Sequence, residues 1–497
     1  MNGILLTAVG VAVRSVSLAF NSLITRSIGA EGVGLFALIG TVYSFAVTFA
    51  TSGISLTVTR LTSAAIGEGK SGEARGILRS AFIYSLVFGS FATAVLFFGA
   101  EYFGATVLSD GRCVLPLRIL SLSLLPIALS SVLSGYFVGV KRVAKNAVVQ
   151  VLSQVFKLTV TVSLVLRFSR LGVAAGVTAL AVGMTLTELA CFLVALVQYF
   201  IDKHRYLRAA PSRSDFGEVL GMAVPLAVSA YIRSALLTLE HILIPRRLRA
   251  RGASSGEALS AYGILHGMAL PMLLYPMAPL TSFAGLLVPE FAEGNARAEH
   301  SRIDRMASEA INTTLVYSIA ATVLVALFSE ELGYAVYGSF EAGKYIMLMA
   351  PVLPIMYLDH VSDAMLKGIG EHVYSMWVNI TDSVLSIVLV WVLIPRLGIG
   401  GYALVIVVME GYNFALSALR LSKRVRIRIE PFRSLVLPLA AAISAALISK
   451  RIFVFEGSTV APVWLFLRIL FAVSAFIFIY LTLARFIFRK RRKYFCR

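Results

Sequence analysis

Two charged side chains stand seven residues apart in a stretch apolar enough to cross a lipid bilayer. Residues 222–247 contain Arg233 and Glu240. Because seven residues are close to two helical turns, both side chains are expected to project from one face. An ionisable group at membrane depth costs from about 2.5 to more than 10 kcal/mol, so it normally faces a partner or a cavity. Two interpretations stay open: a structural Arg–Glu pair, or a polar cavity through which a charged molecule passes.

Other cations lie in or at the ends of apolar stretches. Arg14 occupies the first stretch, Lys157 a later one, and Arg60 ends the segment SLTVTRL. The anions best matched to arginine are phosphates, which accept paired, charge-assisted hydrogen bonds. Arg14, Arg233, Arg60 and Lys157 are therefore the candidate substrate-binding residues. For Lys157 a hydrogen bond to its neighbour Gln154 is the ordinary alternative.

Acidic residues also interrupt the apolar stretches. They are Glu188, Glu240, Asp359, Asp363, Asp382 and Glu410. Carboxylates at membrane depth pair with cations or serve as ion or proton sites. Asn379, Asp382 and Ser383 form a compact group of oxygen atoms that, with Glu240, could ligate a coupling cation such as Na⁺. The alternative for this group is hydrogen bonding between helices.

No enzymatic or metal-binding motif accompanies these residues. The three cysteines, Cys113, Cys191 and Cys496, are isolated, and the six histidines are scattered. Nor does the sequence contain a Walker loop, a GxSxG or an HExxH motif. The sequence therefore predicts a protein that is not an enzyme and that has no structural metal and no cofactor. The membrane potential or a cation gradient, of Na⁺ or H⁺, is the expected driving force.

The composition is that of an integral membrane protein. Of the 497 residues, 58% are hydrophobic and only 14% are charged, against about 25% charged in soluble domains. The net charge of +19 comes from basic residues in short loops, which contact anionic membrane lipids. A nucleic-acid partner is not expected, since nucleic-acid binders carry basic residues as a face on a soluble fold.

The apolar stretches predict an all-α protein with about fourteen membrane spans, given about 20 residues for each span. Spans are expected at 4–25, 33–55, 79–100, 114–138, 146–167, 172–200, 219–245, 262–288, 309–329, 345–366, 373–395, 399–419, 432–449 and 462–488. Most Lys and Arg residues fall in loops on the side of the N-terminus. The positive-inside rule then places both termini in the cytoplasm. Four arginines, at 246, 247, 249 and 251, break this pattern.

Two halves of the chain resemble each other. RLGVAAG at 170–176 matches RLGIGGY at 396–402, and Arg14 matches Arg233, with one period of roughly 220–226 residues. Two six-span lobes, 1–210 and 215–425, are predicted, followed by two further spans within 432–488. An even number of spans makes the repeats parallel, with Arg14 and Arg233 facing a central cleft.

Particular motifs resemble a known superfamily. RSIGAEGVGLFAL (26–38) and SGISLTVTRLTSAAIGEGK (52–70) are similar to the stage V sporulation protein B branch of the multidrug/oligosaccharidyl-lipid/polysaccharide (MOP) exporters. Similarity to MurJ-type lipid II flippases is weaker, because Phe20 and Asn21 replace an Arg-Asp pair of that group. Some MurJ-type proteins bind Na⁺, and Glu240, Asn379 and Asp382 are the nearest matches to the residues that do so.

The combined expectation is a flippase for lipid-linked oligosaccharides in the cytoplasmic membrane. It would move undecaprenyl-diphosphate-linked glycan or peptidoglycan precursors by alternating access, in sporulation or in vegetative wall synthesis. Its expected partners are the lipid-linked glycan, membrane lipids and cell-wall synthesis proteins. The alternatives are a multidrug/cation antiporter of the same superfamily, a membrane scaffold for cell-wall enzymes and, third, a glycan polymerase.

Overall fold

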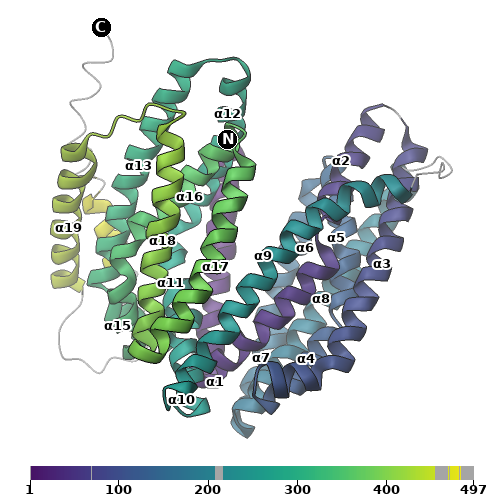
Figure 1. Ribbon diagram of the computed structural model, residues 1–497, viewed down its shortest axis with the longest axis horizontal. Helices are drawn as coiled ribbons and strands as arrows, with labels where there is room; N and C mark the ends of the chain where they lie inside the picture. Colours follow the sequence, from purple (N-terminus) through teal and green to yellow (C-terminus); the bar gives the residue numbers. More distant parts are fainter. Residues whose placement is uncertain are drawn as a thin grey trace. The chain divides into compact units, whose positions relative to one another are not determined.

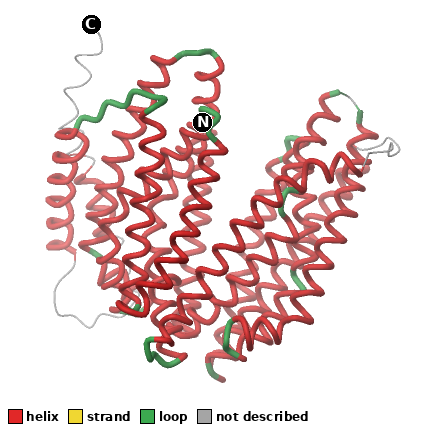
Figure 2. Tube along the Cα trace, viewed as in Figure 1, coloured by secondary structure: helices red, strands yellow, loops and turns green. Residues whose placement is uncertain are grey.

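The protein is built from helices. The computed structural model describes residues 2–68, 70–206, 216–453, 468, 471–480 and 482. Helix makes up 92% of the structure, and the described part of the chain contains no strand (Figure 2). In a bilayer each backbone N–H and C=O must be satisfied within its own segment, which a helix achieves. The prediction of an all-helical protein is confirmed.

Eleven helices in the described part are long and apolar enough to span a membrane, or twelve if one bent pair counts as a span. The expected number was about fourteen, and the two counts differ in two places. The stretch Ser15–Gly67 joins the first two predicted spans. Of the predicted span 462–488, the structure describes only a short helix, Phe471–Tyr480, so the rest of that prediction lies outside the described residues.

Helix α1 (Asn2–Thr51) joins the first two predicted spans through Gly29, where the backbone leaves helical geometry with φ 71° and ψ 178°. Such a positive φ favours glycine, which has no Cβ atom to clash. The 53 residues of Ser15–Gly67 would extend about 80 Å as one helix, more than twice the roughly 30 Å of the hydrocarbon core. A break at Gly29 is therefore expected between two passages.

The chain forms two compact units, which comprise residues 23–263 and residues 1–22 with 264–497. The lobes predicted from the sequence repeat, 1–210 and 215–425, stay a prediction, and the compact units group two segments differently. The first half of α1 packs with the later part of the chain, and α9 (Phe216–Ala250) packs with the earlier part. Residues 432–453 also belong to the second of these units rather than standing apart.

The first unit, Leu23–Gly263, is called the N-unit here. Its buried core combines side chains of α2, α3, α5, α8 and α9, among them Ile54, Tyr84, Tyr136, Tyr199 and Ala223. Besides the second half of α1 and α9, its α-helices are α2 (Ile54–Gly67), α3 (Ser71–Glu101), α4 (Val114–Ser121), α5 (Leu124–Gly139), α6 (Val143–Phe156), α7 (Val162–Phe168), α8 (Val173–Tyr206) and α10 (Ser255–Tyr262).

The second unit, with residues 1–22 and 264–497, is called the C-unit. Helices α16, α17 and α18 lie beside one another in it (Figure 1). After the first half of α1, its α-helices are α11 (Leu270–Leu274), α12 (Ala278–Ala296), α13 (His300–Leu327), α14 (Ser329–Tyr337), α15 (Phe340–Met349), α16 (Leu353–Gly368), α17 (His372–Leu397), α18 (Ile399–Ser422), α19 (Leu437–Phe453) and Phe471–Tyr480.

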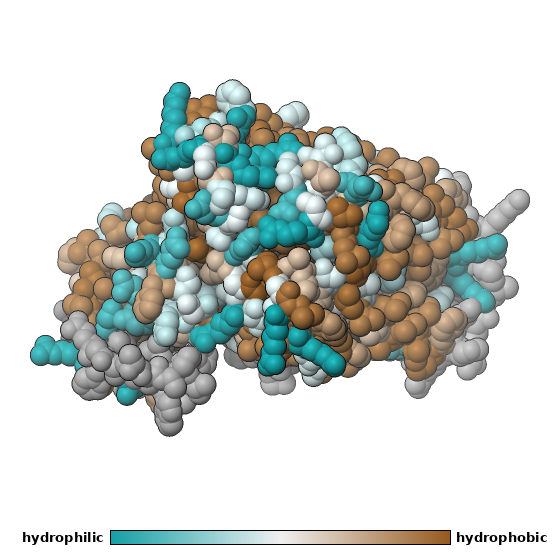
Figure 3. Space-filling view, turned by 90° about the horizontal axis from the view of Figure 1, so that it is seen from below, coloured by the Kyte–Doolittle hydropathy of each residue, from teal (hydrophilic) through white to brown (hydrophobic). Residues whose placement is uncertain are grey.

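Large apolar side chains are exposed along the helices. Phe91 and Phe98 on α3 are 58% and 80% exposed. Exposed apolar surface on this scale is unusual for a soluble protein. Figure 3 looks onto one end of the helices, where hydrophilic residues gather while hydrophobic residues surround them. Both observations indicate a multi-pass membrane protein.

Candidate functional site

Helix α9 is held along the second half of α1 by a row of hydrogen bonds (Figure 1). The Tyr231 hydroxyl donates to the carbonyl of Phe49 at 3.0 Å, and the Thr238 hydroxyl donates to the carbonyl of Thr41 at 3.2 Å. Between them the Ser234 and Thr48 hydroxyls lie 3.3 Å apart. Buried polar bonds of this kind fix the rotation of a membrane helix about its axis.

A glycine brings α2 close to the same helix. Gly53, before the first residue of α2, has φ +79°, and a Cβ atom there would lie 2.2 Å from the carbonyl oxygen of Ala223 on α9. Only glycine combines that backbone angle with so close an approach. The contacts to α1 and α2 together fix which side of α9 is covered and which stays exposed.

Arg233 lies on the exposed side of α9, at the middle of the 35-residue helix Phe216–Ala250. The middle of a helix centred in the hydrocarbon core, which is about 30 Å thick, lies about 15 Å from either edge of that core, beyond the reach of an arginine side chain. The guanidinium therefore cannot extend to the membrane surface, and it would be costly to place in hydrocarbon. An exposed cation at this depth indicates a surface that meets water or an anion.

Glu240 differs from Arg233 although both belong to α9. Its side chain is buried, only 9% exposed, near Ile242 and Ile244. The expectation that Glu240 combines with Asn379, Asp382 and Ser383 stays a prediction, because Glu240 belongs to the N-unit and the others to the C-unit.

The other predicted cations occupy different environments. Arg60 is exposed on α2, on the side that also exposes Leu56. Lys157 is half-buried at the start of a π-helical turn, Lys157–Thr161, and lies within electrostatic range of Glu188 on α8. π-Helical turns inside longer helices are frequent at functional sites. The side chain of Arg14 lies outside the described residues, and its role stays a prediction.

Two members of the predicted oxygen group bond within α17. The Asn379 amide donates to the carbonyl of Ser375 at 2.7 Å, and the Ser383 hydroxyl donates to the carbonyl of Asn379 at 3.0 Å. These are local bonds to the preceding turn, which polar side chains commonly make in membrane helices. They occupy the donors of both side chains and leave the oxygen atoms available to accept.

A cluster of three carboxylates forms where α16, α17 and α18 meet. Glu410 lies within electrostatic range of both Asp359 and Asp382, and all three are half-buried. The Ser417 hydroxyl donates to Asp359 at 2.8 Å. Among the described residues no group of three His, Cys, Asp or Glu side chains is arranged to hold a metal ion. The sequence shows an acidic residue in each of three apolar spans, but it does not predict that the three helices bring these residues together.

Asp363, one turn after Asp359, belongs to a separate group near the end of α16. Lys367 donates to its carboxylate at 2.5 Å, and the Ser375 hydroxyl donates to the other oxygen. Lys367 lies in the last turn of α16, and Ser375 lies in the first turn of α17. Asp363 is thus neutralised locally, whereas Asp359 faces further carboxylates.

The arginines that broke the charge pattern bind the backbone at one end of the N-unit. Arg246 donates to the carbonyl of Thr106 at 2.6 Å, and Arg249 donates to that of Ser109 at 3.0 Å. These carbonyls belong to the irregular end of α3, where helical partners are missing. Arg246 and Arg249, which the sequence placed in a loop but which lie in the last turns of α9, therefore have a structural role here.

A neighbouring ion network joins this end of α3 to α1. Arg112 bonds to Glu31 at 2.7 Å and to Asp110 at 2.8 Å. Burial alone would raise the pKa of Asp110, but hydrogen bonds from the Arg112 side chain and backbone, with the charges of Arg112 and Arg249, lower it below its usual value. Asp110 therefore stays ionised at neutral pH.

Comparisons with known proteins agree with this architecture. The family model described as polysaccharide biosynthesis protein matches residues 1–295, and the MatE model matches residues 252–392. Stage V sporulation protein B of Bacillus subtilis (strain 168) is 27% identical over 461 residues, which are 90% of this chain and 88% of that protein. Lipid II flippase MurJ of the same organism is 24% identical over 394 residues, 73% and 71% of the two chains.

Solved structures share the fold. An inward-closed structure of lipid II flippase MurJ matches with a TM-score of 0.70 at 15% identity, covering 98% of this chain and 99% of that one. An inward-facing multidrug resistance MATE family transporter of the MOP superfamily matches with a TM-score of 0.67 at 14% identity, covering 84% and 98%. The protein is thus a multi-pass membrane transporter of the MOP superfamily. It belongs to the polysaccharide biosynthesis protein family, whose model matches more than half of the chain.

Proposed function

We propose that this protein is a flippase for lipid-linked oligosaccharides in the cytoplasmic membrane. It moves undecaprenyl-diphosphate-linked glycan or peptidoglycan precursors from the cytoplasmic to the outer leaflet by alternating access. The family assignment to polysaccharide biosynthesis and the sequence similarity to a lipid II flippase support this substrate class.

The observation that carries the proposal is the exposure of Arg233 in the middle of a membrane-spanning helix. A diphosphate offers several oxygen atoms to a guanidinium, which binds such groups in pairs. A buried side chain, paired within the helix bundle, would have argued against an anionic substrate. In the proposed mechanism Arg233 and its repeat counterpart Arg14 bind the diphosphate, Arg60 and Lys157 add positive charge, and the lipid tail stays in the bilayer.

Coupling is proposed to use carboxylates. Glu240, Asn379, Asp382 and Ser383 are the candidate residues for binding Na⁺ or H⁺, and the cluster of Asp359, Asp382 and Glu410 adds two carboxylates to this set. A negative cluster at membrane depth attracts a cation or a proton. Binding of either would bias one of two conformations, provided that its affinity differs between them.

The orientation is inferred from the charge distribution, and the partners are inferred from the proposed function. Both termini are proposed to lie in the cytoplasm, with the two predicted six-helix repeats in parallel orientation. The proposed partners are the lipid-linked glycan, the surrounding lipids and cell-wall synthesis proteins. The similarity to a stage V sporulation protein favours a place in wall synthesis during sporulation.

Reconstitution in vesicles tests the substrate class. Purified protein in liposomes receives a fluorescent undecaprenyl-diphosphate disaccharide, and an impermeant reductant quenches only the probe in the outer leaflet. Wild-type protein is expected to make the whole population accessible, and Arg14→Ala and Arg233→Ala should each slow that process. Unchanged rates in both variants, or no translocation by the wild type, would contradict the proposal.

A multidrug/cation antiporter is the second candidate. The MatE match over 252–392, the likeness to a MATE fold and the carboxylate cluster of the C-unit favour it, because cationic drugs require negative charge. The same vesicles loaded with a cationic dye such as ethidium distinguish the two. Gradient-dependent dye transport without movement of the diphosphate probe would replace the flippase proposal with this one.

A further inference from the structure

The segment between α18 and α19 is bound along α13 by a row of hydrogen bonds. Figure 2 shows a loop between these two helices of the C-unit. Residues 425–430 of this loop are called the strap here. Alternate backbone N–H groups of the strap donate to side chains of α13: Arg426 to Asp304 at 2.8 Å, Arg428 to Ser308 at 3.0 Å, and Glu430 to Asn312 at 3.3 Å. One face of α13 therefore binds the strap along its length.

The spacing of these bonds indicates that the strap is extended. Four residues of an α-helix rise about 6 Å, and two residues of an extended chain rise about 6.7 Å, so alternate residues of the strap can follow every fourth residue of α13. The carbonyl of Arg428 also accepts from the Asn312 amide at 2.9 Å. In a β-strand the N–H and C=O of one residue point to the same side. One edge of the strap is thus satisfied by α13.

The opposite edge of the strap carries unpaired backbone groups. In an extended segment the N–H groups of Ile427 and Ile429 point away from those of Arg426 and Arg428. Within the described ranges of the chain, neither isoleucine N–H donates a hydrogen bond. Such an edge is a template for pairing with another extended chain. The strap therefore offers main-chain hydrogen bonds to a peptide.

Two arginines of the strap carry charge that no carboxylate neutralises. Arg426 and Arg428 are exposed, and among the residues that the structure describes neither guanidinium forms an ion pair or a hydrogen bond. The carboxylate of Asp304 accepts from the backbone of Arg426. Arg424 differs, since Glu371 binds its guanidinium at 2.8 Å. The two uncompensated charges stand two residues apart, which is also the spacing of side chains on one side of a second strand.

The other side of the strap becomes uncovered along its length. Val425 is 3% exposed, Ile427 is half-buried, and Ile429 is 53% exposed. An uncovered isoleucine beside an open strand edge offers an apolar cross-strand contact. A matching strand therefore has apolar side chains on this side and negative charge on the other.

We propose that the strap binds an extended acidic peptide of a partner protein, which adds to its open edge as a second strand. The backbone of the peptide pairs with Ile427 and Ile429, and its apolar side chains lie beside theirs. Its alternate acidic side chains pair with Arg426 and Arg428. An anionic lipid headgroup also matches the arginines, but it leaves the backbone edge unpaired, so a peptide fits better. The proposal does not depend on the transported substrate, since no proposed substrate or coupling residue belongs to the strap.

Fluorescence anisotropy of a labelled peptide on the full-length protein in detergent tests the proposal. The probe has about seven residues, within the usual length of a strand, and glutamate and valine alternate in it. Two reference peptides have the same composition. One groups the glutamates at one end, and the other carries N-methyl groups on the valines, which lie opposite Ile427 and Ile429.

The alternating peptide is expected to bind at least about tenfold more tightly than either reference, because each lost main-chain bond or ion pair weakens binding about threefold or more. Equal binding of the grouped or the N-methylated peptide would show that only charge attracts the probe, and would overturn the proposal.

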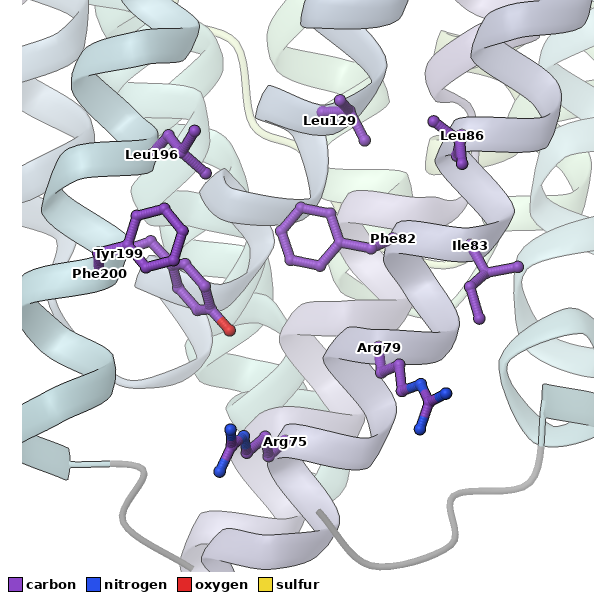
Figure 4. A pocket seen from close by; sticks show the side chains of 9 residues that line it. All are labelled: Arg75, Arg79, Phe82, Ile83, Leu86, Leu129, Leu196, Tyr199 and Phe200. Carbon is purple, nitrogen blue, oxygen red and sulfur yellow. The ribbon is translucent and has the colours of Figure 1, made fainter. Parts of the chain in front are cut away.

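Variants locate the binding on the strap. Arg426→Ala/Arg428→Ala should weaken binding of the alternating peptide about tenfold, since each exposed ion pair contributes about threefold. The matched control is Arg79→Ala/Arg251→Ala, which removes two exposed arginines of the N-unit and should leave binding unchanged. Arg79 lines a groove of that unit (Figure 4). Size-exclusion profiles check that both variants are folded. If the strap variant binds like wild type, or the control weakens binding as much, the proposal fails.

Nanodiscs distinguish a peptide from a lipid as the occupant of the strap. In nanodiscs that contain phosphatidylglycerol, wild type should still bind the alternating peptide about tenfold more tightly than Arg426→Ala/Arg428→Ala does. Comparing the two proteins in the same nanodiscs removes the general repulsion between the peptide and the anionic lipid. If the difference disappears there, headgroups occupy the arginines and the proposal is overturned.

Discussion

Helix α9 of the N-unit and the group α16–α18 of the C-unit both carry charge at membrane depth, but of opposite sign and exposure. Arg233 is exposed at the middle of α9, whereas Asp359, Asp382 and Glu410 are half-buried, and both aspartates lie within electrostatic range of Glu410. An exposed cation is suited to a ligand that arrives and leaves. A partly enclosed group of carboxylates is suited to a small ion or a proton.

The contrast shows that the exposure of a charged side chain, and not only its sign, separates binding of a large ligand from binding of a small ion. We propose that the diphosphate binds Arg233 of the N-unit together with Arg14 of the C-unit, and that coupling rests mainly on the C-unit carboxylates. If this separation is correct, changes in one region should affect a different observable from changes in the other.

The largest effect is expected for Arg233. Arg233→Ala removes two charge-assisted hydrogen bonds to a diphosphate and should lower the translocation rate about 100-fold, whereas Arg233→Lys keeps the charge and should lower it about tenfold. The vesicle assay with the undecaprenyl-diphosphate probe measures both. Arg251→Ala, at an exposed residue just after the end of the same helix, is the control and should behave as wild type. Equal rates for the Ala and Lys variants would refute paired binding.

A second prediction concerns Glu410. Glu410→Gln removes one carboxylate from the cluster and should reduce gradient-driven transport about tenfold, because the cation or proton that it binds no longer biases the conformational equilibrium. Binding of the diphosphate probe, measured in detergent, should stay within a factor of two or so. Glu341→Gln, exposed in the first turn of α15, is the control. A loss of probe binding in Glu410→Gln would show that substrate binding and coupling do not use separate groups of residues.

A third prediction tests the ion network that joins α1 to the segment between α3 and α4. Arg112→Ala breaks its bonds to Glu31 and Asp110 and should lower the free energy of unfolding by about 1–2 kcal/mol, allowing for partial solvent screening. Because the folded pKa of Asp110 is lowered, the stabilisation is present above the unfolded value near 3.8 and is lost as pH falls through the folded value.

Thermal unfolding in detergent at pH 7 and at about pH 3.5 checks the sign of that dependence. The difference between wild type and Arg112→Ala should shrink at the lower pH. A difference that grows on acidification would show that Asp110 is not the titrating partner. Transport should change less than in Arg233→Ala.

The smallest effect is expected at the surface of the C-unit. Glu371, before the first residue of α17, binds Arg420 and Arg424, each at 2.8 Å, and hydrogen bonds from Arg420 hold the pKa of Glu371 below its usual value. Arg424 is 57% exposed and Arg420 32%, and each arginine can still pair with the remaining amide oxygen, so Glu371→Gln should cost about 0.5–1 kcal/mol. Unfolding at low and high salt measures it. A larger cost, insensitive to salt, would mean that this pair acts like the partly buried network of the N-unit.

Much of the architecture follows from local sequence. Long apolar stretches interrupted by Arg233, Glu240, Asp382 and Glu410 predict an all-helical membrane protein with charges at depth, because hydropathy and helical length depend only on residues close in sequence. The motifs at 26–38 and 52–70 likewise pointed to the superfamily, which the family model and the relatives confirm.

Only the tertiary structure decided how those charges are used. Sequence spacing places Arg233 and Glu240 on one face, yet Glu240 is buried and Arg233 is exposed, because contacts of α9 with α1 and α2 cover part of the helix. The packing of α9 with the N-unit and the carboxylate cluster both join helices that are distant in sequence. Such contacts depend on complementary surfaces of several helices at once, and the period of one helix does not contain that information.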